Sequence, residues 1–514
     1  MALGMAGGYR IYRHMASPGL TLNRGSDGSV QQVLNLIRQK YVDSIGLDSL
    51  ELSAIGAITG RLDPHSIFIP KTEIEDVDAD LAGSFSGIGV EYQIIRDTLM
   101  VTDVVKGGPA DNAGVEAGDA VYMVENQIIA GKKLGNREIR EQLRGKKGTT
   151  VEIGIIRNGA SIVKKITRGS IPLKSVDTYY MVADSIGYLK INRFAETTFF
   201  EFMDGATYLQ KNGMKCLVLD LRGNPGGLLE EATKIADELL EDGLGIVTVK
   251  GAKTRESKVM ATKPGIFEEG KIVVLVDEQS ASASEVLAGA LQDNDRATII
   301  GRRSFGKGLV QEQYPLENGG ALRLTVARYY TPLGRSIQKS YQNGNKNYKE
   351  EIFLRFHQPG FGNTQDTVGR KVFYTRKGKA LYEAGGITPD IPVSFDTSVL
   401  PRAVVRFYNA PVFDEICFDL YRQDKGAMKP LKSPGQFDSS FSFNPLQWQY
   451  IFTRTKADSI ILENLKEGER KLIEEQVKAQ LARYRWGNEG FFKLVNAKDP
   501  VYLKAIDFLK YNKS

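Results

Sequence analysis

Two short segments of this chain carry residue types that together can perform acyl transfer. The first contains Ser282 within an alternating run of serine and alanine at 280–284, and the second contains Lys307 between Gly306 and Gly308. A serine hydroxyl is a weak nucleophile and needs a proton acceptor within hydrogen-bond reach. A lysine amine accepts that proton only when it is neutral, so burial must lower its pKa from about 10.4 toward about 7–8. The two segments therefore predict a nucleophile and its base.

A strand, a turn and a helix are expected to position the serine. Residues 271–276 form a β-rich apolar run of the length expected for a buried strand. Apolar residues then recur with helical spacing at Val286, Leu287, Ala290 and Leu291. A hydroxyl residue at a strand–helix turn lies beside the free backbone N–H groups of the helix start. A further short strand at 298–300 leads into the segment with Lys307.

Each segment also fits a simpler structure. Serine at a helix start most often only caps the helix, and a glycine–lysine–glycine sequence most often forms an exposed turn. Residues 301–307 also have the spacing of a phosphate-binding loop that follows a strand. That loop requires Ser or Thr as its next residue to hold magnesium, and this chain has Gly308. The phosphate-binding alternative therefore fails at a residue that its chemistry needs.

The combination of the two segments resembles the carboxy-terminal processing (tail-specific) peptidases, which are serine–lysine proteases that carry a PDZ domain. The resemblance is carried by Ala281-Ser282-Ala283-Ser284-Glu285, Ser304-Phe305-Gly306-Lys307-Gly308 and Gln311. It covers most of residues 30–395, although the family often has Thr at the position of Ser304. It implies that Ser282 is the nucleophile, Lys307 the base and Gln311 the partner that orients the lysine.

A glycine-rich turn is the second part of the expected site. Residues 216–221 read as a buried strand, and Arg222-Gly223-Asn224-Pro225-Gly226-Gly227 follows it before a predicted helix. Such a turn exposes backbone N–H groups that suit an oxyanion. By resemblance, one N–H comes from Gly226 or Gly227 and the other from Ala283. A dinucleotide-binding turn would need the full Gly-x-Gly-x-x-Gly pattern, which this stretch lacks.

Residues 83–170 have the pattern of one compact module, which resembles a PDZ domain of the bacterial, circularly permuted type. Its Gly-x-Gly loop consists of Ser86, Gly87, Ile88, Gly89 and Val90. Such a loop leaves successive backbone N–H groups pointing together, which suits a terminal carboxylate. The neighbouring strand edge can then pair with an extended peptide. Ile88 and Val90 are expected to line an apolar pocket beside the loop.

Composition places the chain among soluble globular proteins, because 42% of its 514 residues are hydrophobic and 25% are charged. The net charge of +6 comes from 68 basic and 62 acidic residues that are interspersed, which does not predict a nucleic-acid-binding surface. Two cysteines exclude a disulfide scaffold, and three histidines far apart in sequence do not predict a zinc site. No metal or organic cofactor is expected.

No segment reaches the roughly 18–20 apolar residues of a membrane span. The first ten residues nevertheless read like the end of an apolar signal or anchor whose start is missing. Together with the family resemblance, this favours a periplasmic or cell-envelope protein. Membrane association through such an anchor and homo-oligomer formation are open alternatives.

The expected fold is a multidomain α+β protein with an α/β serine-protease core, built by resemblance from crotonase/Clp-like ββα units, an inserted PDZ domain and helical N- and C-terminal regions. The expected divisions are a linker or anchor remnant (1–29), a helical N-terminal region (30–82), the PDZ domain (83–170), the protease core (171–398, with an exposed insertion at 341–370) and a helical C-terminal domain (399–514). The expected function is a serine endopeptidase that cleaves protein substrates near free, apolar C-termini. The alternatives are a non-catalytic PDZ scaffold and, less favoured, a nucleotide-binding enzyme that uses residues 301–308.

Overall fold

The computed structural model describes residues 28–511, apart from 184, 343, 358–369, 384 and 395–400. The chain divides into two compact units, one up to residue 68 and one from residue 69 onward. In the first unit, α2 (Ser29–Lys40) and α3 (Leu47–Thr59) are helices, as their apolar spacing predicts. A turn follows in which the Asp63 carboxylate accepts hydrogen bonds from the Ser66 hydroxyl (2.6 Å) and the His65 N–H (3.0 Å).

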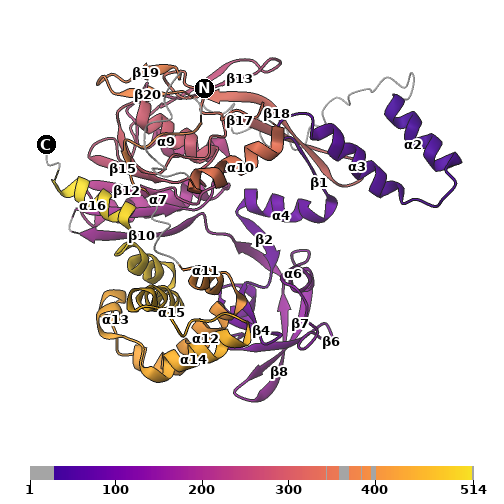
Figure 1. Cartoon of the computed structure of the whole chain (residues 1–514), viewed down its shortest axis with the longest axis vertical. Helices are drawn as coiled ribbons and strands as arrows, with labels where there is room; N and C mark the ends of the chain where they lie inside the picture. Colours follow the sequence, from indigo (N-terminus) through magenta and orange to yellow (C-terminus); the bar gives the residue numbers. More distant parts are fainter. Residues whose placement is uncertain are drawn as a thin grey trace. The chain divides into compact units, whose positions relative to one another are not determined.

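The second unit is built around a six-stranded sheet of order β10-β11-β12-β15-β16-β21 (Figure 1). β10 and β11 are antiparallel, and the other neighbours are parallel. The strands are β10 (Val176–Ala183), β11 (Ile186–Ile191), β12 (Cys216–Asp220), β15 (Lys271–Val276), β16 (Ala297–Gly301) and β21 (Ile391–Pro392). Because both faces of such a sheet are covered, the central strands are continuous apolar runs, as residues 217–219 and 272–276 are.

The two faces of this sheet are covered by helices from different parts of the chain. One face packs against α7 (Thr198–Lys211), α8 (Leu229–Asp237) and α9 (Ala283–Asp293). The opposite face packs against α16 (Pro500–Tyr511), close to the end of the chain. Leu219 and Val274 belong to the first core, whereas their neighbours Val218 and Val273 belong to the second, because successive side chains of a strand point to opposite faces.

A second sheet carries the segment that follows Lys307. It contains β17 (Leu309–Pro315), β18 (Ala321–Tyr330), β13 (Gly245–Lys250) and β14 (Ser257–Met260), each antiparallel to its neighbours. β17 begins two residues after Lys307 and includes Gln311. The small hairpin β19 (Val372–Tyr374) and β20 (Ala380–Tyr382) lies further along the chain.

The module expected at 83–170 spans residues 84–172. The short strand β1 (Ile67–Ile69) and α4 (Lys71–Ala82) precede it in the chain. β2 (Ser84–Gly87) and β9 (Gly169–Pro172) pair antiparallel where the chain enters and leaves it. Between them lie β3 (Val90–Ile95), β4 (Thr98–Val104), α5 (Pro109–Asn112), β5 (Ala120–Val124), β6 (Gln127–Ile128), α6 (Asn136–Leu143), β7 (Thr150–Arg157) and β8 (Ala160–Thr167). The module has its own core, in which Val101, Val151 and Ile153 are fully buried.

The described residues of the stretch 341–370 are mostly exposed or half-buried, as their polar composition predicts. Helix α10 (Gly344–His357) occupies much of this stretch and buries Tyr348 and Arg355. The Arg355 guanidinium pairs with Glu351 and donates to the Ser304 carbonyl (2.8 Å). The charge of Arg355 can be buried because it finds these partners. The described part of this stretch is therefore largely exposed or half-buried, with two buried side chains that hold α10 to the rest of the chain.

Beyond residue 400 the chain is helical, as predicted. The helices before α16 are α11 (Arg402–Tyr408), α12 (Pro411–Met428), α13 (Pro434–Ser440), α14 (Pro445–Ala457) and α15 (Glu467–Asn496). Ile473, Val477 and Leu481 are fully buried in a core formed by these helices. α16 instead packs against the six-stranded sheet, so the C-terminal region both forms its own core and covers one face of that sheet. Within the described residues, no helix is long and apolar enough to span a membrane.

The C-terminal helices also contact the outer face of the PDZ hairpin β3–β4. Phe418 packs with Ile95 and Met100, and the Tyr484 hydroxyl donates to Gln93 Oε1 (3.2 Å). Alternate β3 residues such as Tyr92 pack toward the PDZ core instead. The C-terminal region therefore joins the PDZ module to the protease core.

Removing a buried side chain of α16 is expected to destabilise the protease core. Ile506 is 6% exposed against the protease sheet, and an isoleucine-to-alanine change at such a site costs about 2–5 kcal/mol of unfolding free energy. Leu503 lies on the same helix but is 42% exposed, so Leu503→Ala is the matched control. Urea unfolding followed by circular dichroism measures both variants. Equal stability of Ile506→Ala and Leu503→Ala would show that α16 does not support the core.

Candidate active site

Ser282 lies at the turn between β15 and α9, with a backbone conformation that is rare for a residue with a side chain. Its φ is 56° and its ψ is −115°. Such strain costs on the order of 1–3 kcal/mol and persists only where the surroundings enforce it. Here the Ser282 N–H donates to Glu285 Oε2 (2.9 Å), and the Ser282 carbonyl accepts the N–H groups of Glu285 (2.9 Å) and Val286 (3.0 Å). The turn is thus held by the first residues of α9.

The two neighbouring serines have structural roles. The buried Ser280 hydroxyl donates to the Leu221 carbonyl (2.9 Å), and the buried Ser284 hydroxyl donates to the Asn224 carbonyl (3.0 Å). Both hydroxyls therefore tie the helix start to the turn that follows β12. Ser282 is the half-buried member of the three.

The buried carboxylate of Glu285 joins the serine turn to the lysine segment. Its Oε1 accepts from the Ser304 hydroxyl (2.5 Å) and the Gly306 N–H (2.7 Å). Its Oε2 accepts from the Ser282 N–H (2.9 Å) and the Lys307 N–H (2.8 Å). Burial raises the pKa of Glu285, and the hydrogen bonds oppose that rise only in part. Segments that are 25 positions apart in sequence therefore meet at one oxygen atom.

Hydrogen bonds hold both the side-chain amine and the backbone carbonyl of Lys307. Its Nζ donates to Gln311 Oε1 (2.8 Å), and its carbonyl accepts the hydroxyl of the buried Tyr329. Tyr329 also reaches the Ser282 side chain. Burial raises the pKa of the Tyr329 phenol well above its ordinary value, and the nearby Glu285 carboxylate raises it further.

The flanking glycines allow the lysine segment to pass close to other backbone. A Cβ atom on Gly306 would lie 3.1 Å from backbone atoms of Gly385 and Gly386, and one on Gly308 would lie 3.1 Å from the Gln338 nitrogen. These separations are too short for an ordinary carbon contact, so larger residues would displace the segment.

The glycine-rich turn lies directly against Ser282. A Cβ atom on Gly226 would stand 2.8 Å from the Ser282 Cβ and 3.0 Å from the Ala283 nitrogen. The Gly226 N–H donates to Asn224 Oδ1 (2.9 Å) and is therefore occupied. The N–H groups of Gly227 and Ala283 have no acceptor among the residues that the structure describes. Of the two glycine amides considered from sequence, that of Gly227 is thus the one available to a ligand.

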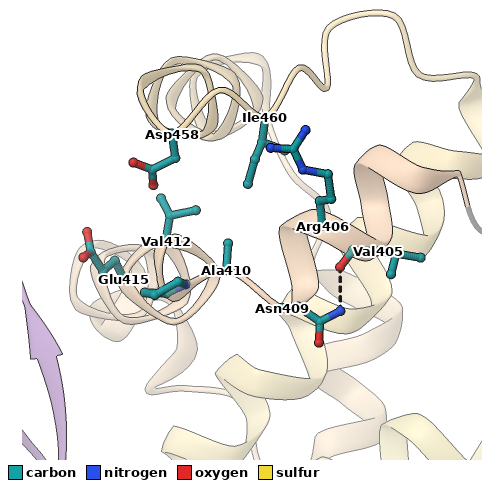
Figure 2. Close-up of a pocket in the computed structure, with 9 residues that line it drawn as sticks. Val405, Arg406, Asn409, Ala410, Val412, Glu415, Asp458 and Ile460 are labelled. Carbon is teal, nitrogen blue, oxygen red and sulfur yellow. Dashed lines mark hydrogen bonds between the residues drawn. The ribbon is translucent and has the colours of Figure 1, made fainter. Parts of the chain in front are cut away.

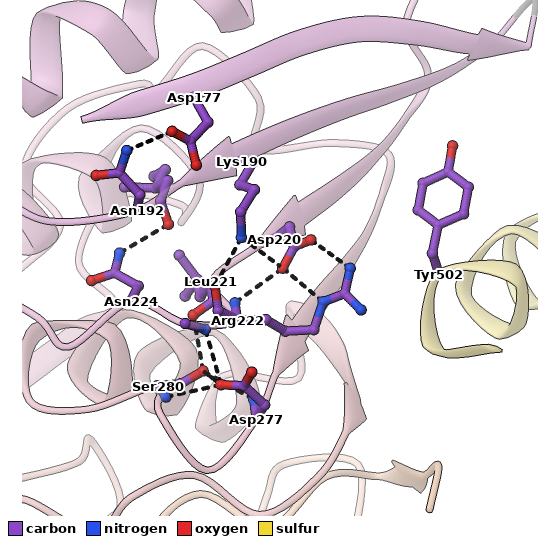
Figure 3. A network of polar contacts seen from close by, with 12 residues as sticks. Asp177, Lys190, Asn192, Asp220, Leu221, Arg222, Asn224, Asp277, Ser280 and Tyr502 are labelled. Atoms are coloured by element: carbon purple, nitrogen blue, oxygen red, sulfur yellow. Dashed lines mark hydrogen bonds and ion pairs between the residues drawn. The ribbon is translucent and has the colours of Figure 1, made fainter. Parts of the chain in front are cut away.

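A polar network stands at the carboxyl end of β12, just before this turn (Figure 3). The buried Asp220 accepts from Arg222 Nε (3.0 Å), Arg222 Nη2 (2.7 Å) and the Tyr188 hydroxyl (2.7 Å). Burial alone would raise the pKa of Asp220, but Arg222 and Lys190 outweigh burial and hold the pKa well below its usual range. Lys190 Nζ also donates to the Arg222 carbonyl (2.8 Å).

Glu285 lies within the sequence motif, but its role was not predicted from sequence, and neither were the roles of Asp220, Arg222 and Tyr329. Glu285 follows Ser282 by three residues, which is the spacing at which a glutamate side chain reaches back to the N–H of a helix-capping residue. The sequence therefore contained a signal for the contact between Glu285 and Ser282. The contact from Glu285 to Lys307 has no such local signal, because it depends on how the chain folds back.

The Gly-x-Gly loop of the PDZ module has a fixed backbone. Ser86 and Gly87 belong to β2, and the carbonyls of Ile88 and Gly89 accept from Ala110 (2.8 Å) and Val105 (3.0 Å). Ile88 is buried in the PDZ core, so it is not an open pocket wall, whereas Val90 is only partly buried at the start of β3. Across the described residues, no group of three or more His, Cys, Asp or Glu side chains is arranged to hold a metal ion.

A separate hollow of about 540 Å³ lies within the C-terminal helices (Figure 2). Its lining residues are Val405, Arg406, Asn409, Ala410, Pro411, Val412, Glu415, Asp458 and Ile460. The lining includes no serine or cysteine nucleophile and no lysine. Its size does not make it the reactive site, which is defined by the strained Ser282 and its neighbours.

Comparison with known proteins agrees with these features. The family model for peptidase family S41 matches residues 185–344, and that for the PDZ domain matches residues 86–166. A carboxy-terminal-processing protease from Bartonella bacilliformis is 39% identical over 313 residues, which cover 60% of this chain and 71% of that protein. A probable CtpA-like serine protease from Staphylococcus aureus strain N315 is 36% identical over 312 residues, which cover 60% of this chain and 62% of that protein. Among solved structures, a photosystem II D1 C-terminal processing protease matches with 28% identity and a TM-score of 0.36, over 71% of this chain and 87% of that one.

The raised pKa of Glu285 predicts how stability depends on pH. A carboxyl whose pKa is higher in the folded chain binds more protons when folded, so its contribution to stability falls as pH rises above the ordinary value of 4.5. The glutamine in Glu285→Gln does not titrate. The unfolding free energy of the wild type minus that of the variant should therefore decrease between about pH 4 and pH 8. Urea unfolding at several pH values measures this difference, and an increase with pH would show that the hydrogen bonds outweigh burial.

Proposed function

The chain belongs to the carboxy-terminal-processing proteases of peptidase family S41, and on this premise we propose that Ser282 and Lys307 form the nucleophile and general base of a serine endopeptidase. The observation that carries the proposal is the shared oxygen of Glu285, which binds the backbone N–H groups of both residues. The contact from Lys307 Nζ to Gln311 Oε1 supports the same assignment, because it directs the amine. Gln311 is therefore a positioning residue.

The reaction follows from these groups. As the Ser282 Oγ attacks the scissile carbonyl, its proton passes to the neutral amine of Lys307. The negative charge on the carbonyl oxygen is stabilised by the N–H groups of Gly227 and Ala283, which the structure leaves without protein acceptors among its described residues. Lys307 returns the proton to the leaving amine as the C–N bond breaks, which produces an acyl-enzyme. Water then attacks that ester with the same base.

The two alternative functions lose support at particular residues. A nucleotide-binding loop at 301–308 would need free N–H groups for phosphate, but those of Gly306 and Lys307 already donate to the Glu285 carboxylate. A carboxylate at that place would also repel a phosphate. A non-catalytic PDZ scaffold would give no reason for the strained backbone of Ser282, whereas a nucleophile held at a sharp strand–helix turn does.

The PDZ module extends the proposal to the substrate. We infer that it binds free, apolar C-termini of protein substrates at the loop 86–90, where backbone N–H groups receive the carboxylate and the edge of β3 pairs with the tail. β3 pairs with β4 on one side, which leaves its other edge for such pairing. Family membership also favours action outside the cytoplasm, in the periplasm or cell envelope.

Labelling with a fluorophosphonate probe tests the assignment of the nucleophile. The label should appear on Ser282 and should be lost in Ser282→Ala and strongly reduced in Lys307→Ala. Peptide cleavage by the double variant should be little worse than by either single variant, because each change removes the same step. Ser284→Ala is the matched control and should keep the label, since its hydroxyl already bonds to Asn224. A label on Ser280 or Ser284, or additive losses of rate, would contradict the assignment.

Blocking the carboxylate of a substrate tests the role of the PDZ module. A protein substrate with a free, apolar C-terminus should be cleaved about tenfold faster than its amidated twin, because charge-assisted hydrogen bonds contribute roughly 1.5–3 kcal/mol each. Initial rates at substrate concentrations below KM give the comparison. A short peptide without the recognised tail is the control, and its rate should not depend on amidation. Equal cleavage of the two long twins would refute carboxylate recognition.

A further inference from the structure

Asp499 joins the C-terminal helices to the polar network at the end of β12. Its Oδ1 accepts the N–H of Tyr502 (2.7 Å) and so caps α16, while its Oδ2 accepts from Arg222 Nη1 (2.8 Å). The other nitrogens of Arg222, Nε and Nη2, bind the two oxygens of Asp220. One carboxylate therefore fixes both the start of a helix and the remaining nitrogen of the guanidinium. Figure 3 shows Arg222 beside Asp220, with Tyr502 of α16 facing the same network.

Asp499 is one of two carboxylates that pair directly with the Arg222 guanidinium. Lys190 and Arg222 are mostly buried cations, and Asp220 is a fully buried anion. Asp499, whose side chain is 22% exposed, supplies the second negative charge. A buried charge is costly unless an opposite charge pairs with it. Loss of the Asp499 charge would thus leave the Arg222 guanidinium with Asp220 as its one directly paired carboxylate among the described residues.

This network leads directly into the turn that carries Gly227. The Arg222 carbonyl is held by Lys190 Nζ (2.8 Å), and the next N–H, that of Gly223, donates to Asp277 Oδ1 (3.0 Å). The turn then approaches Ser282 so closely that only glycine fits at residue 226. Arg222 is thus the first residue of the segment that reaches Gly227 five positions later, and its guanidinium contacts are among those that fix the start of this segment.

We propose that Asp499 is a positioning residue for peptide cleavage, which holds Arg222 and thereby keeps residues 223–227 in the geometry that receives the oxyanion. This inference rests on the proposed function of Ser282 and Gly227. The S41 family model matches residues 185–344, so the contact comes from outside the matched part of the chain. The C-terminal helices thus complete the active site in addition to covering the protease sheet.

Asp499→Asn separates the two roles of this side chain, because the asparagine oxygen still caps α16 while the charge facing Arg222 is lost. In the full-length protein, kcat per titrated active site should fall about tenfold, because displaced groups away from the reacting atoms lower rates by up to about 10²-fold. KM for the same peptide should change less than about twofold, since Asp499 does not touch the substrate. Hydrogen exchange of the amides of 223–227 should become faster, and this measurement needs no substrate.

Two further variants complete the test. Asp499→Ala removes the helix cap as well and should add a lower Tm to the same loss of kcat. Glu415→Gln is the matched control, because Glu415 pairs with Arg454 (2.6 Å) inside the C-terminal helices and does not contact Arg222. Glu415→Gln should leave kcat and the exchange at 223–227 as in the wild type.

The outcomes are distinguishable. Wild-type kcat together with wild-type exchange in Asp499→Asn would overturn the proposal, and so would a rise in KM at unchanged kcat. A wild-type protein that cleaves no peptide would refute the proposed function. In that case the exchange measurement alone would still decide whether Asp499 holds the turn.

Discussion

The proposed chemistry depends on the hydrogen bonds of the buried Glu285 carboxylate. A carboxylate removed from water is costly, and here four donors from two separate segments offset that cost. The same four hydrogen bonds fix the Ser282 turn and the Lys307 segment relative to each other. Because the geometry of both segments is over-determined, the strained backbone of Ser282 can persist. Reactivity and local stability thus share one set of contacts.

Close approach of backbone is the second constraint around this carboxylate. Gly226 touches the Ser282 turn, and Gly306 and Gly308 pass neighbouring backbone so closely that a Cβ atom on either would require the neighbouring atoms to shift. The N–H groups of Gly226, Gly306 and Gly308 already have partners, so these contacts fix the path of the backbone, and the proposed reaction uses the N–H groups of Gly227 and Ala283 instead. Backbone donors are held by the whole fold and need little rearrangement, which is the physical advantage of building an oxyanion site from turns.

The C-terminal helices extend this construction beyond the part of the chain that the peptidase family model covers. α16 covers the face of the protease sheet opposite to α9, and α12 and α15 contact the β3–β4 hairpin of the PDZ module. Asp499 lies at the point where this region reaches the network around Arg222. One helical region therefore contacts the PDZ module, the six-stranded sheet and the polar network around Arg222.

The sequence alone determined the features that depend on neighbouring residues. The buried strand before Ser282, the helix after it and the helical C-terminal region follow from local periodicity, whereas the PDZ module and the pairing of Gln311 with Lys307 followed from the motifs that carry the family resemblance. Only the tertiary structure decided which groups are already occupied. It showed that the Ser280 and Ser284 hydroxyls and the Gly226 N–H have partners, that Arg355 of α10 reaches the Ser304 carbonyl, and that Asp499 reaches Arg222. Most of these contacts join residues far apart in the chain, so no local pattern encodes them, and whether a hydroxyl or an amide is available depends on which partner the folded chain brings to it.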